Sequence, residues 1–208
     1  MNVFDLGHPI LMAIVGEGGA RSAGQAVRGG ADLIQVRAKE LCGRDLASLV
    51  REVVAEVGAP DRVIVNSRAD IAELTGACGV QLPESGLDPR DVRRAFPGLL
   101  IGVSRHGRAG LERAGGAGAD FAILGPVFGT PGKQGRMMGL DGFQAIFHGL
   151  AIPILAVGGV SAANAPEILA RGARGLAAIR LFADPSRAQA QARELRKAMD
   201  GAGREFGP

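Results

Sequence analysis

The sequence predicts a single domain, residues 1–208, folded as a closed (β/α)₈ TIM barrel. Short apolar runs alternate eight times with helical stretches (208/8 = 26 residues per unit). The runs are continuously apolar, which indicates strands of a parallel sheet covered on both faces. Eight such units close into a barrel near the short end of the size range of that fold. An open, doubly wound sheet is the alternative, but no glycine-rich dinucleotide-binding fingerprint follows the first run to support it.

The first half of the chain supplies four strand–helix units. Their apolar runs and helical stretches are 9–15 and 20–28, 32–37 and 44–57, 62–66 and 69–75, and 79–82 and 89–95. In the second helical stretch, Leu46, Leu49 and Val50 have the i, i+3, i+4 spacing of one helix face. Asp88-Pro89 is typical of a helix start, because an N-cap residue precedes a proline at the first helical position.

The second half repeats the pattern. Its runs and stretches are 99–104 and 110–116, 120–125 and 141–147, 153–158 and 164–170, and 175–180 and 186–199. Four helices end in glycine-containing sequences directly before the next strand, which predicts left-handed C-caps: RGGAD, TGACG, GAGAD and RGARG. Residues 201–208 are expected to form a flexible tail.

Composition and charge indicate a soluble globular protein, with 47% hydrophobic and 22% charged residues. The net charge of +3 comes from arginines spread evenly along a chain without Tyr or Trp. The chain therefore lacks the basic stripe and the stacking aromatics of a nucleic-acid-binding protein. Cys42 and Cys78 form no disulfide framework, and no signal peptide or membrane span is recognised. These features predict a cytoplasmic protein that binds neither nucleic acid nor membrane.

Active sites of this fold lie at the C-terminal ends of the strands. Arg37 and Lys39 follow the second run, and strand alternation would put both on one side, where they suit a phosphate or carboxylate. Solvated surface charge is the alternative. Asn66 ends the third run and could orient a heterocycle or simply form a turn. Gly158-Gly159 after the seventh run predicts a phosphate site at a helix N-terminus, against a simple tight turn.

The longest connection is 125–139, whose glycines and prolines suit a lid that closes over substrate and delivers Lys133 to an anion. A surface loop is the alternative. Of the three histidines, His8 precedes the first strand and His148 ends a helix, so only His106 is expected at the catalytic end. Imidazole exchanges protons near neutral pH, so His106 is the candidate catalytic residue. An ordinary polar residue at the junction of a strand and a loop is the alternative.

Five motifs in order resemble the thiamin phosphate synthase superfamily over about residues 10–185: QVRAK, VNSRADIAELTGACGVQLPESGL, RRAFPGLLIGVSRH, GADFAILGPVFGTPGK and IPILAVGGVSAAN. Within it the chain looks more like the thiazole tautomerase branch. The resemblance implies a barrel, a role in thiamin biosynthesis, a phosphorylated thiazole as ligand and a homodimer. Further residues predicted to contact this ligand are Ser104, Gly125, Thr130, Ile179 and Arg180, of which Arg180 replaces a small residue.

The two branches differ in their metal requirement. The synthase displaces diphosphate from a pyrimidine with Mg²⁺ held by two aspartates. This chain has neither: Ser67 stands at the first position, and the segment near Gly86 lacks the second aspartate. The tautomerase moves a proton on a thiazole carboxylate phosphate without metal, and its histidine maps onto His106. We therefore predict a tautomerase, an isomerase without cofactor. The alternatives are a Mg²⁺-dependent thiamin phosphate synthase, a non-catalytic regulator that binds thiazole phosphate, and another phosphate-binding barrel isomerase.

Overall fold

A computed structural model of the chain, which describes residues 4, 6–129 and 137–205, confirms the TIM barrel. In that part of the chain, eight parallel strands form one closed sheet in sequence order. Strand β8 (Gly175–Ala178) pairs with β1 (Ile10–Val15), with Ile10 opposite Gly175 and Ala13 opposite Ala178. This closing pair excludes the open, doubly wound sheet.

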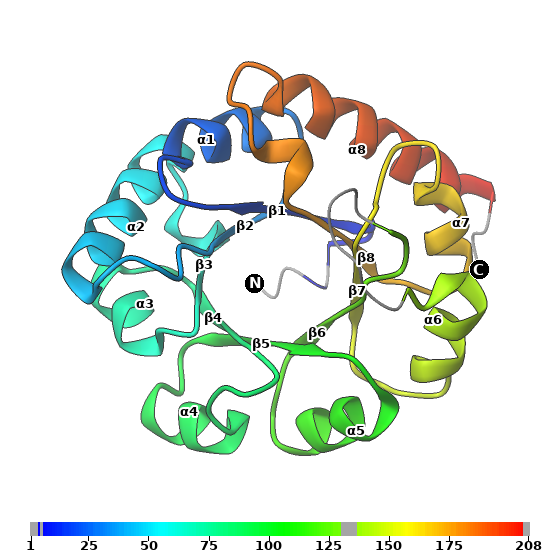
Figure 1. Ribbon diagram of the computed structural model, residues 1–208, viewed down its shortest axis with the longest axis horizontal. Coiled ribbons are helices and arrows are strands. Elements are labelled where there is room, and N and C mark those ends of the chain that lie inside the picture. Colours follow the sequence, from blue (N-terminus) through cyan, green and yellow to red (C-terminus); the bar gives the residue numbers. More distant parts are fainter. Residues whose placement is uncertain (1–3, 5, 130–136, 206–208) are drawn as a thin grey trace.

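The helices form an outer ring around the strands (Figure 1). The remaining strands are β2 (Leu33–Val36), β3 (Val63–Asn66), β4 (Gly79–Leu82), β5 (Leu100–Arg105), β6 (Phe121–Leu124) and β7 (Ile154–Val157). The α-helices are α1 (Ala20–Arg28), α2 (Gly43–Val57), α3 (Ala69–Thr75), α4 (Pro89–Ala95), α5 (Arg108–Gly116), α6 (Gly139–Phe147), α7 (Ala165–Ala170) and α8 (Ala188–Glu205). Two 3₁₀ helices, η2 (Pro60–Arg62) and η3 (Arg180–Phe182), complete the described elements.

The alternation of side chains along each strand creates two apolar layers. One set fills the barrel interior, where Phe4 and Phe121 stack with ring centroids 5.0 Å apart. The other set packs between the strands and the surrounding helices. Because both faces of every strand are buried, the strands read as continuous apolar runs in the sequence.

Several predicted boundaries differ from the structure by one or more residues, and three of these differences concern the last strand and the last helix. The eighth strand ends at Ala178 rather than at residue 180, and Arg180 begins η3. Helix α8 begins at Ala188 instead of residue 186, because Ser186 donates from its backbone N–H and its hydroxyl to Asp184 in a turn. The same helix runs to Glu205 and so takes in most of the predicted tail. No helix in the described ranges combines the length and apolar character needed to cross a bilayer.

Candidate active site at the C-terminal end of the barrel

Polar side chains line one half of the barrel interior near its C-terminal end. Consecutive strands β2 to β5 supply them: Gln35, Asn66, Gln81 and Ser104. The other half of the interior is apolar, with Ile14, Ile123 and Ala177 in the same inner layer. This asymmetry suits a ligand that carries both an apolar ring and groups that form hydrogen bonds.

Gln81 and Ser104 join the two central strands of this polar half. The Gln81 amide donates to the Ser104 hydroxyl over 3.0 Å. Gln81 is fully buried, and its Oε1 has no hydrogen-bond partner among the described residues. A Cβ added to Gly102 would lie 2.2 Å from this oxygen and 2.2 Å from Cζ of Phe121. Glycine at 102 therefore makes room for the glutamine side chain.

The end of β3 is held in an unusual backbone conformation. Ser67 has a φ of +65°, the only left-handed non-glycine residue in the described chain. Its N–H donates to the Gln81 carbonyl over 2.9 Å, and its hydroxyl accepts from the Asn66 amide over 2.8 Å. Backbone strain of this kind persists where the surroundings hold it, and it concentrates at functional sites.

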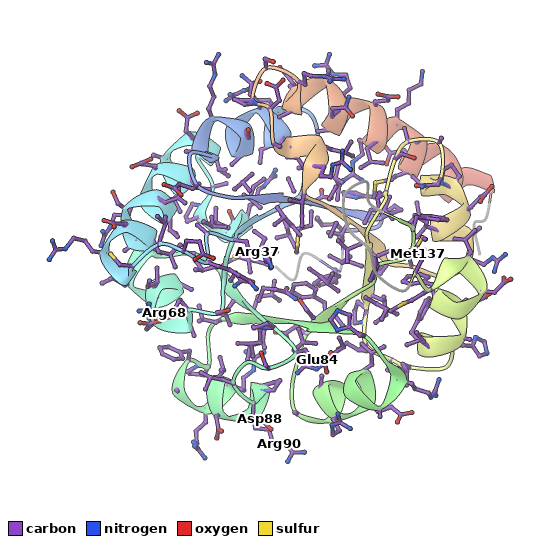
Figure 2. All side chains as sticks on the ribbon, in the orientation of Figure 1. Arg37, Arg68, Glu84, Asp88, Arg90 and Met137 are labelled. Carbon is purple, nitrogen blue, oxygen red and sulfur yellow. The ribbon has the colours of Figure 1, made fainter. Side chains whose placement is uncertain are left out.

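Arg37 and Lys39 are both exposed beyond the end of β2. The strand ends at Val36, so strand alternation does not place them on one side as expected. Instead the β2–α2 loop brings both to a shallow hollow whose rim also carries Glu17, Glu40 and Leu41. Figure 2 shows Arg37 inside the projected ring of strands, whereas Arg68, Asp88 and Arg90 lie out toward α3 and α4.

His106 lies directly after β5 and contacts a carboxylate from the neighbouring strand. Glu84 follows β4, and its Oε2 accepts from the His106 backbone N–H over 3.0 Å and lies 3.1 Å from His106 Nδ1. On its other side, Glu84 Oε1 is 4.0 Å from Arg105 Nε. Arg105 also donates to the carbonyls of Pro83 and Ser104, and burial lowers the pKa of its guanidinium.

Three glycines bring the β6 and β7 ends close together. An added Cβ on Gly125 would lie 2.1 Å from the Val157 carbonyl oxygen. Gly158 and Gly159 have φ values of +96° and +62°, and side chains there would strike Pro126 and Phe128. The contact between the two loops thus requires these glycines, whether or not a phosphate binds there.

The other predicted contacts are only partly described. Ile179 and Arg180 are exposed at the junction of β8 and η3, in the loop that follows the eighth strand. Thr130 and Lys133 lie outside the described residues. The predicted lid is therefore represented only by its two ends, at Gly125–Gly129 and from Met137 onward.

The sequence signal for two residues of this site was weak. Gln81 appears as one polar letter in the apolar run GVQL, which marks it as an inward-facing residue but not as a partner of Ser104. Glu84 follows that run by two positions. Only the turn in which the Gly86 N–H donates to the Pro83 carbonyl over 2.9 Å brings its carboxylate to His106.

Comparison with known proteins assigns the chain to a family. Residues 11–182 match the family model described as thiamine monophosphate synthase. The chain belongs to this family. A putative thiamine-phosphate synthase from Geobacter sulfurreducens is 42% identical over 167 residues, covering 77% of this chain and 78% of the relative. The thiamine-phosphate synthase of Methanoculleus marisnigri is 41% identical over 177 residues, covering 82% and 83%.

A solved structure in the same family has the same fold. The thiamine phosphate pyrophosphorylase of Pyrococcus furiosus superposes with a TM-score of 0.82 at 28% identity. The superposition covers 95% of this chain and 98% of that one. The predicted superfamily resemblance is thereby confirmed over most of the barrel.

The prediction of a thiazole tautomerase as the main activity is wrong. Relatives that match about four fifths of the chain are named thiamine-phosphate synthases, which favours the first alternative instead. The prediction depended on the two absent aspartates, at Ser67 and near Gly86. Those two positions alter the possible metal donors, but they do not by themselves assign the chain to a branch.

The donor set at these loops does not fit the Mg²⁺ that the synthase branch implies. Ser67 offers only a hydroxyl that already accepts from Asn66. At Gly86 an added Cβ would lie 2.8 Å from Pro83 Cδ, so a side chain there requires the turn to shift. The carboxylates nearby are engaged, since Asp88 accepts from the Arg90 N–H of α4 and Glu84 binds His106.

Asp70, the carboxylate in the first turn of α3, is engaged as well. Arg68 donates two hydrogen bonds to it, one of them 2.8 Å from Nε to Oδ1, and they hold its pKa below the usual range. Within the described residues, no group of three or more His, Cys, Asp or Glu side chains gathers as a metal site. Hard cations such as Mg²⁺ need oxygen ligands, and the described loops after β3 and β4 do not present a free pair of carboxylates.

Proposed function

We propose that the chain is a thiamine-phosphate synthase, a transferase that joins a pyrimidine diphosphate to a thiazole phosphate with loss of diphosphate. The observation that carries the proposal is 41% identity to a protein of that name over 82% of this chain and 83% of the relative. That similarity spans most of the barrel whose loops carry the candidate site. The asymmetric barrel interior supports a site for two heterocycles.

In this function, the cationic loop after β2 and the glycine turn after β7 bind the two anionic groups. Arg37 and Lys39 attract the diphosphate, since guanidinium and ammonium groups bind phosphate oxygens through charge-assisted hydrogen bonds. Gly158 and Gly159 bring backbone close to the thiazole phosphate. The amide and hydroxyl groups of β2 to β5 orient the pyrimidine. The enzyme's main contribution is then to hold the ring nitrogen of the thiazole against the carbon that loses diphosphate.

The test is synthesis of thiamine phosphate by the purified full chain. Both substrates are supplied in one buffer with Mg²⁺ and in one with a chelator, and the product is measured after oxidation to its fluorescent thiochrome. We expect product in at least one buffer. Absence of product in both buffers would rule the transferase out, and retained binding of thiazole phosphate by calorimetry would then favour the non-catalytic binding role.

A matched pair of variants tests the cationic loop. Arg37→Gln is expected to raise the KM for the pyrimidine diphosphate by about tenfold or more, because a charge-assisted hydrogen bond is lost. Arg51→Gln changes an exposed arginine in the middle of α2 and is expected to leave KM unchanged. An equal effect of both variants would show that general positive charge, rather than the loop after β2, attracts the substrate.

Homodimer formation and a cytoplasmic location remain predictions. The family resemblance supports the dimer, and the absence of a disulfide framework supports the compartment. Light scattering of the purified chain at micromolar concentration measures the first directly.

A further inference from the structure

A single carboxylate oxygen of Glu84 contacts two nitrogen atoms of His106. Glu84 Oε2 lies 3.0 Å from the His106 backbone nitrogen and 3.1 Å from its Nδ1. The backbone N–H must donate, so this oxygen is oriented toward the residue and the ring nitrogen completes the contact. Arg105 lies 4.0 Å from the other carboxylate oxygen and balances its charge. The carboxylate is thus held between Arg105, the last residue of β5, and His106, which follows it.

This arrangement determines which ring nitrogen is available for chemistry. A carboxylate only accepts hydrogen bonds, so Nδ1 must carry the proton in its contact with Glu84. Nε2, on the far side of the ring, makes no hydrogen bond to any residue that the structure describes. The side chain of His106 is 65% exposed, which leaves room for a ligand to approach it above β5.

Arg37 and Lys39 attract the diphosphate as a whole, but its leaving oxygen needs a partner of its own. When the carbon–oxygen bond to the diphosphate breaks, its electron pair stays on the diphosphate oxygen, which develops negative charge. A divalent cation commonly stabilises such charge. In this chain, Ser67 and Gly86 supply no carboxylate for a cation, and Asp70 and Asp88 are bound to other groups. A proton donor at the same rim meets the same need.

We propose that Glu84 and His106 form a proton-donating pair that replaces the metal in the departure of diphosphate. The proposal rests on the proposed transferase function. In the step, the thiazole ring nitrogen forms a bond to the pyrimidine methylene carbon, and the carbon–oxygen bond to diphosphate breaks. The Nε2 proton of the His106 imidazolium passes to the departing oxygen, and neutral His106 regains a proton from solvent. His106 is the catalytic residue, and Glu84 is the positioning residue that holds its ring through the contact with Nδ1.

Kinetics in a chelating buffer provide the first test. Product formation is expected to continue in excess chelator. His106→Gln is expected to lower kcat by about 100-fold or more, the typical contribution of a general acid, with KM changed less than kcat. Glu84→Gln retains an acceptor but removes the charge, and its expected loss in kcat is about tenfold. The control is Glu112→Gln, an exposed glutamate paired with Arg108 on α5, which is expected to leave kcat unchanged.

The imidazole nitrogen spectrum provides a test that does not depend on activity. The chain has three histidines, so the signal of His106 is the one absent from His106→Gln. In the unliganded protein above neutral pH, we expect the Nδ1–H tautomer at His106. Glu84→Leu removes the acceptor and is expected to shift the signal toward the Nε2–H tautomer that free imidazole side chains favour. A merely structural role for Glu84 would not move the tautomer.

The outcomes separate this proposal from the proposed function. If the wild-type chain makes product only with Mg²⁺, the transferase stands and the proton-donating pair is wrong. An unchanged tautomer in Glu84→Leu, or equal kcat for Glu84→Gln and Glu112→Gln, also overturns the positioning role. If neither buffer yields product, the transferase and the pair both fail.

Discussion

At the scale of single residues, Gln81 sets the chemistry of the barrel interior. It is fully buried on β4, where its Nε2 donates to Ser104 and its Oε1 has no partner among the described residues. An unpaired buried polar atom is unfavourable by roughly 1–3 kcal/mol. A buried polar residue held at that cost, opposite Asn66 and bonded to Ser104, indicates selection for the site rather than for stability. The glutamine thus adds polar groups to the barrel interior beside Asn66 and the residues that end β5.

The Gln81–Ser104 pair gives a test of this view on stability. Ser104→Ala leaves both ends of the buried amide unpaired, and we expect a loss of about 1–3 kcal/mol in the free energy of unfolding. Gln81→Met keeps a similar volume without polar atoms, and we expect a change within about 1.5 kcal/mol of zero. Urea unfolding followed by circular dichroism measures both. A larger loss for Gln81→Met than for Ser104→Ala would mean that the amide stabilises the barrel.

Residue positions along strands could be predicted, but contacts through loops could not. Counting strands placed Asn66, Ser104 and His106 at the catalytic end, because the fold puts the C-terminal ends of all strands on one side. The pairing of His106 with Glu84 depends on the tight turn from Pro83 to Gly86. The hydrophobic periodicity of the sequence does not predict this turn. The placement of Arg37 failed for a similar reason, since β2 ends one residue earlier than its apolar pattern.

At the scale of elements, the chain is built from four related strand–helix–strand units. Each even-numbered strand is preceded by a Gly-Ala pair whose glycine has a positive φ: Gly30, Gly76, Gly118 and Gly172. The residue after each pair donates its N–H to the preceding strand, at Leu11, Val63, Ile101 and Ile154. These turns end a helix and set the register of the next strand. At α3 this glycine is the left-handed C-cap that the sequence pattern predicted, whereas at α1, α5 and α7 it follows the C-cap residue by one position.

Two glycines at the end of α5 allow the effect of backbone strain to be measured apart from the effect of packing. Nothing lies within 4 Å of an added Cβ on either Gly116 or Gly118, but only Gly118 has a positive φ, of +86°. Gly118→Ala is therefore expected to lower the free energy of unfolding by about 1–2 kcal/mol, the cost of a left-handed conformation for a residue with a Cβ. Gly116→Ala, inside the helix, is expected to raise it by up to about 1 kcal/mol. Chemical unfolding of the two variants is the measurement, and equal effects would contradict the conformational explanation.

Element boundaries depended on contacts that the sequence does not show. The length of α8 exceeded its prediction because its apolar face continues past Met199 to Ala202, which is buried. The flanking glycines, Gly201 and Gly203, favoured an earlier end. Tertiary packing here outweighs intrinsic helix propensity, since burial of an amphipathic face supplies most of the stability of a helix in a protein.

At the scale of the whole molecule, α8 closes the ring of helices against α1 and α7 (Figure 1). Its Arg196 reaches across to the start of the barrel, where it donates to the Pro9 carbonyl over 2.7 Å and pairs with Asp32. Asp32 in turn accepts from the Leu11 N–H of β1 over 2.7 Å. The last helix is thus bonded to the first two strands. A barrel closed in this way is expected to unfold as one unit, because α8 cannot detach without losing its bonds to the start of the barrel.

Leu195 and Cys78 together test this cooperativity. Leu195 is 1% exposed on α8, and Leu195→Ala is expected to lower the free energy of unfolding by about 2–5 kcal/mol. Cys78 precedes β4, on another side of the barrel (Figure 1), and burial raises the pKa of its thiol to about 12. Because the thiolate is the reactive form, Cys78 should react with a disulfide reagent only after unfolding. The exposed Cys42 is replaced by serine to remove its background.

In urea, the loss of helical circular dichroism and the labelling of Cys78 are expected to share one midpoint, and Leu195→Ala should move both equally. The exposed Lys197→Ala on the same helix is the control, with an expected change within about 0.5 kcal/mol. If α8 separates while Cys78 stays protected, the variant will show two midpoints. The final helix would then be a separate folding unit, and closure of the barrel would depend on the β1–β8 pairing alone.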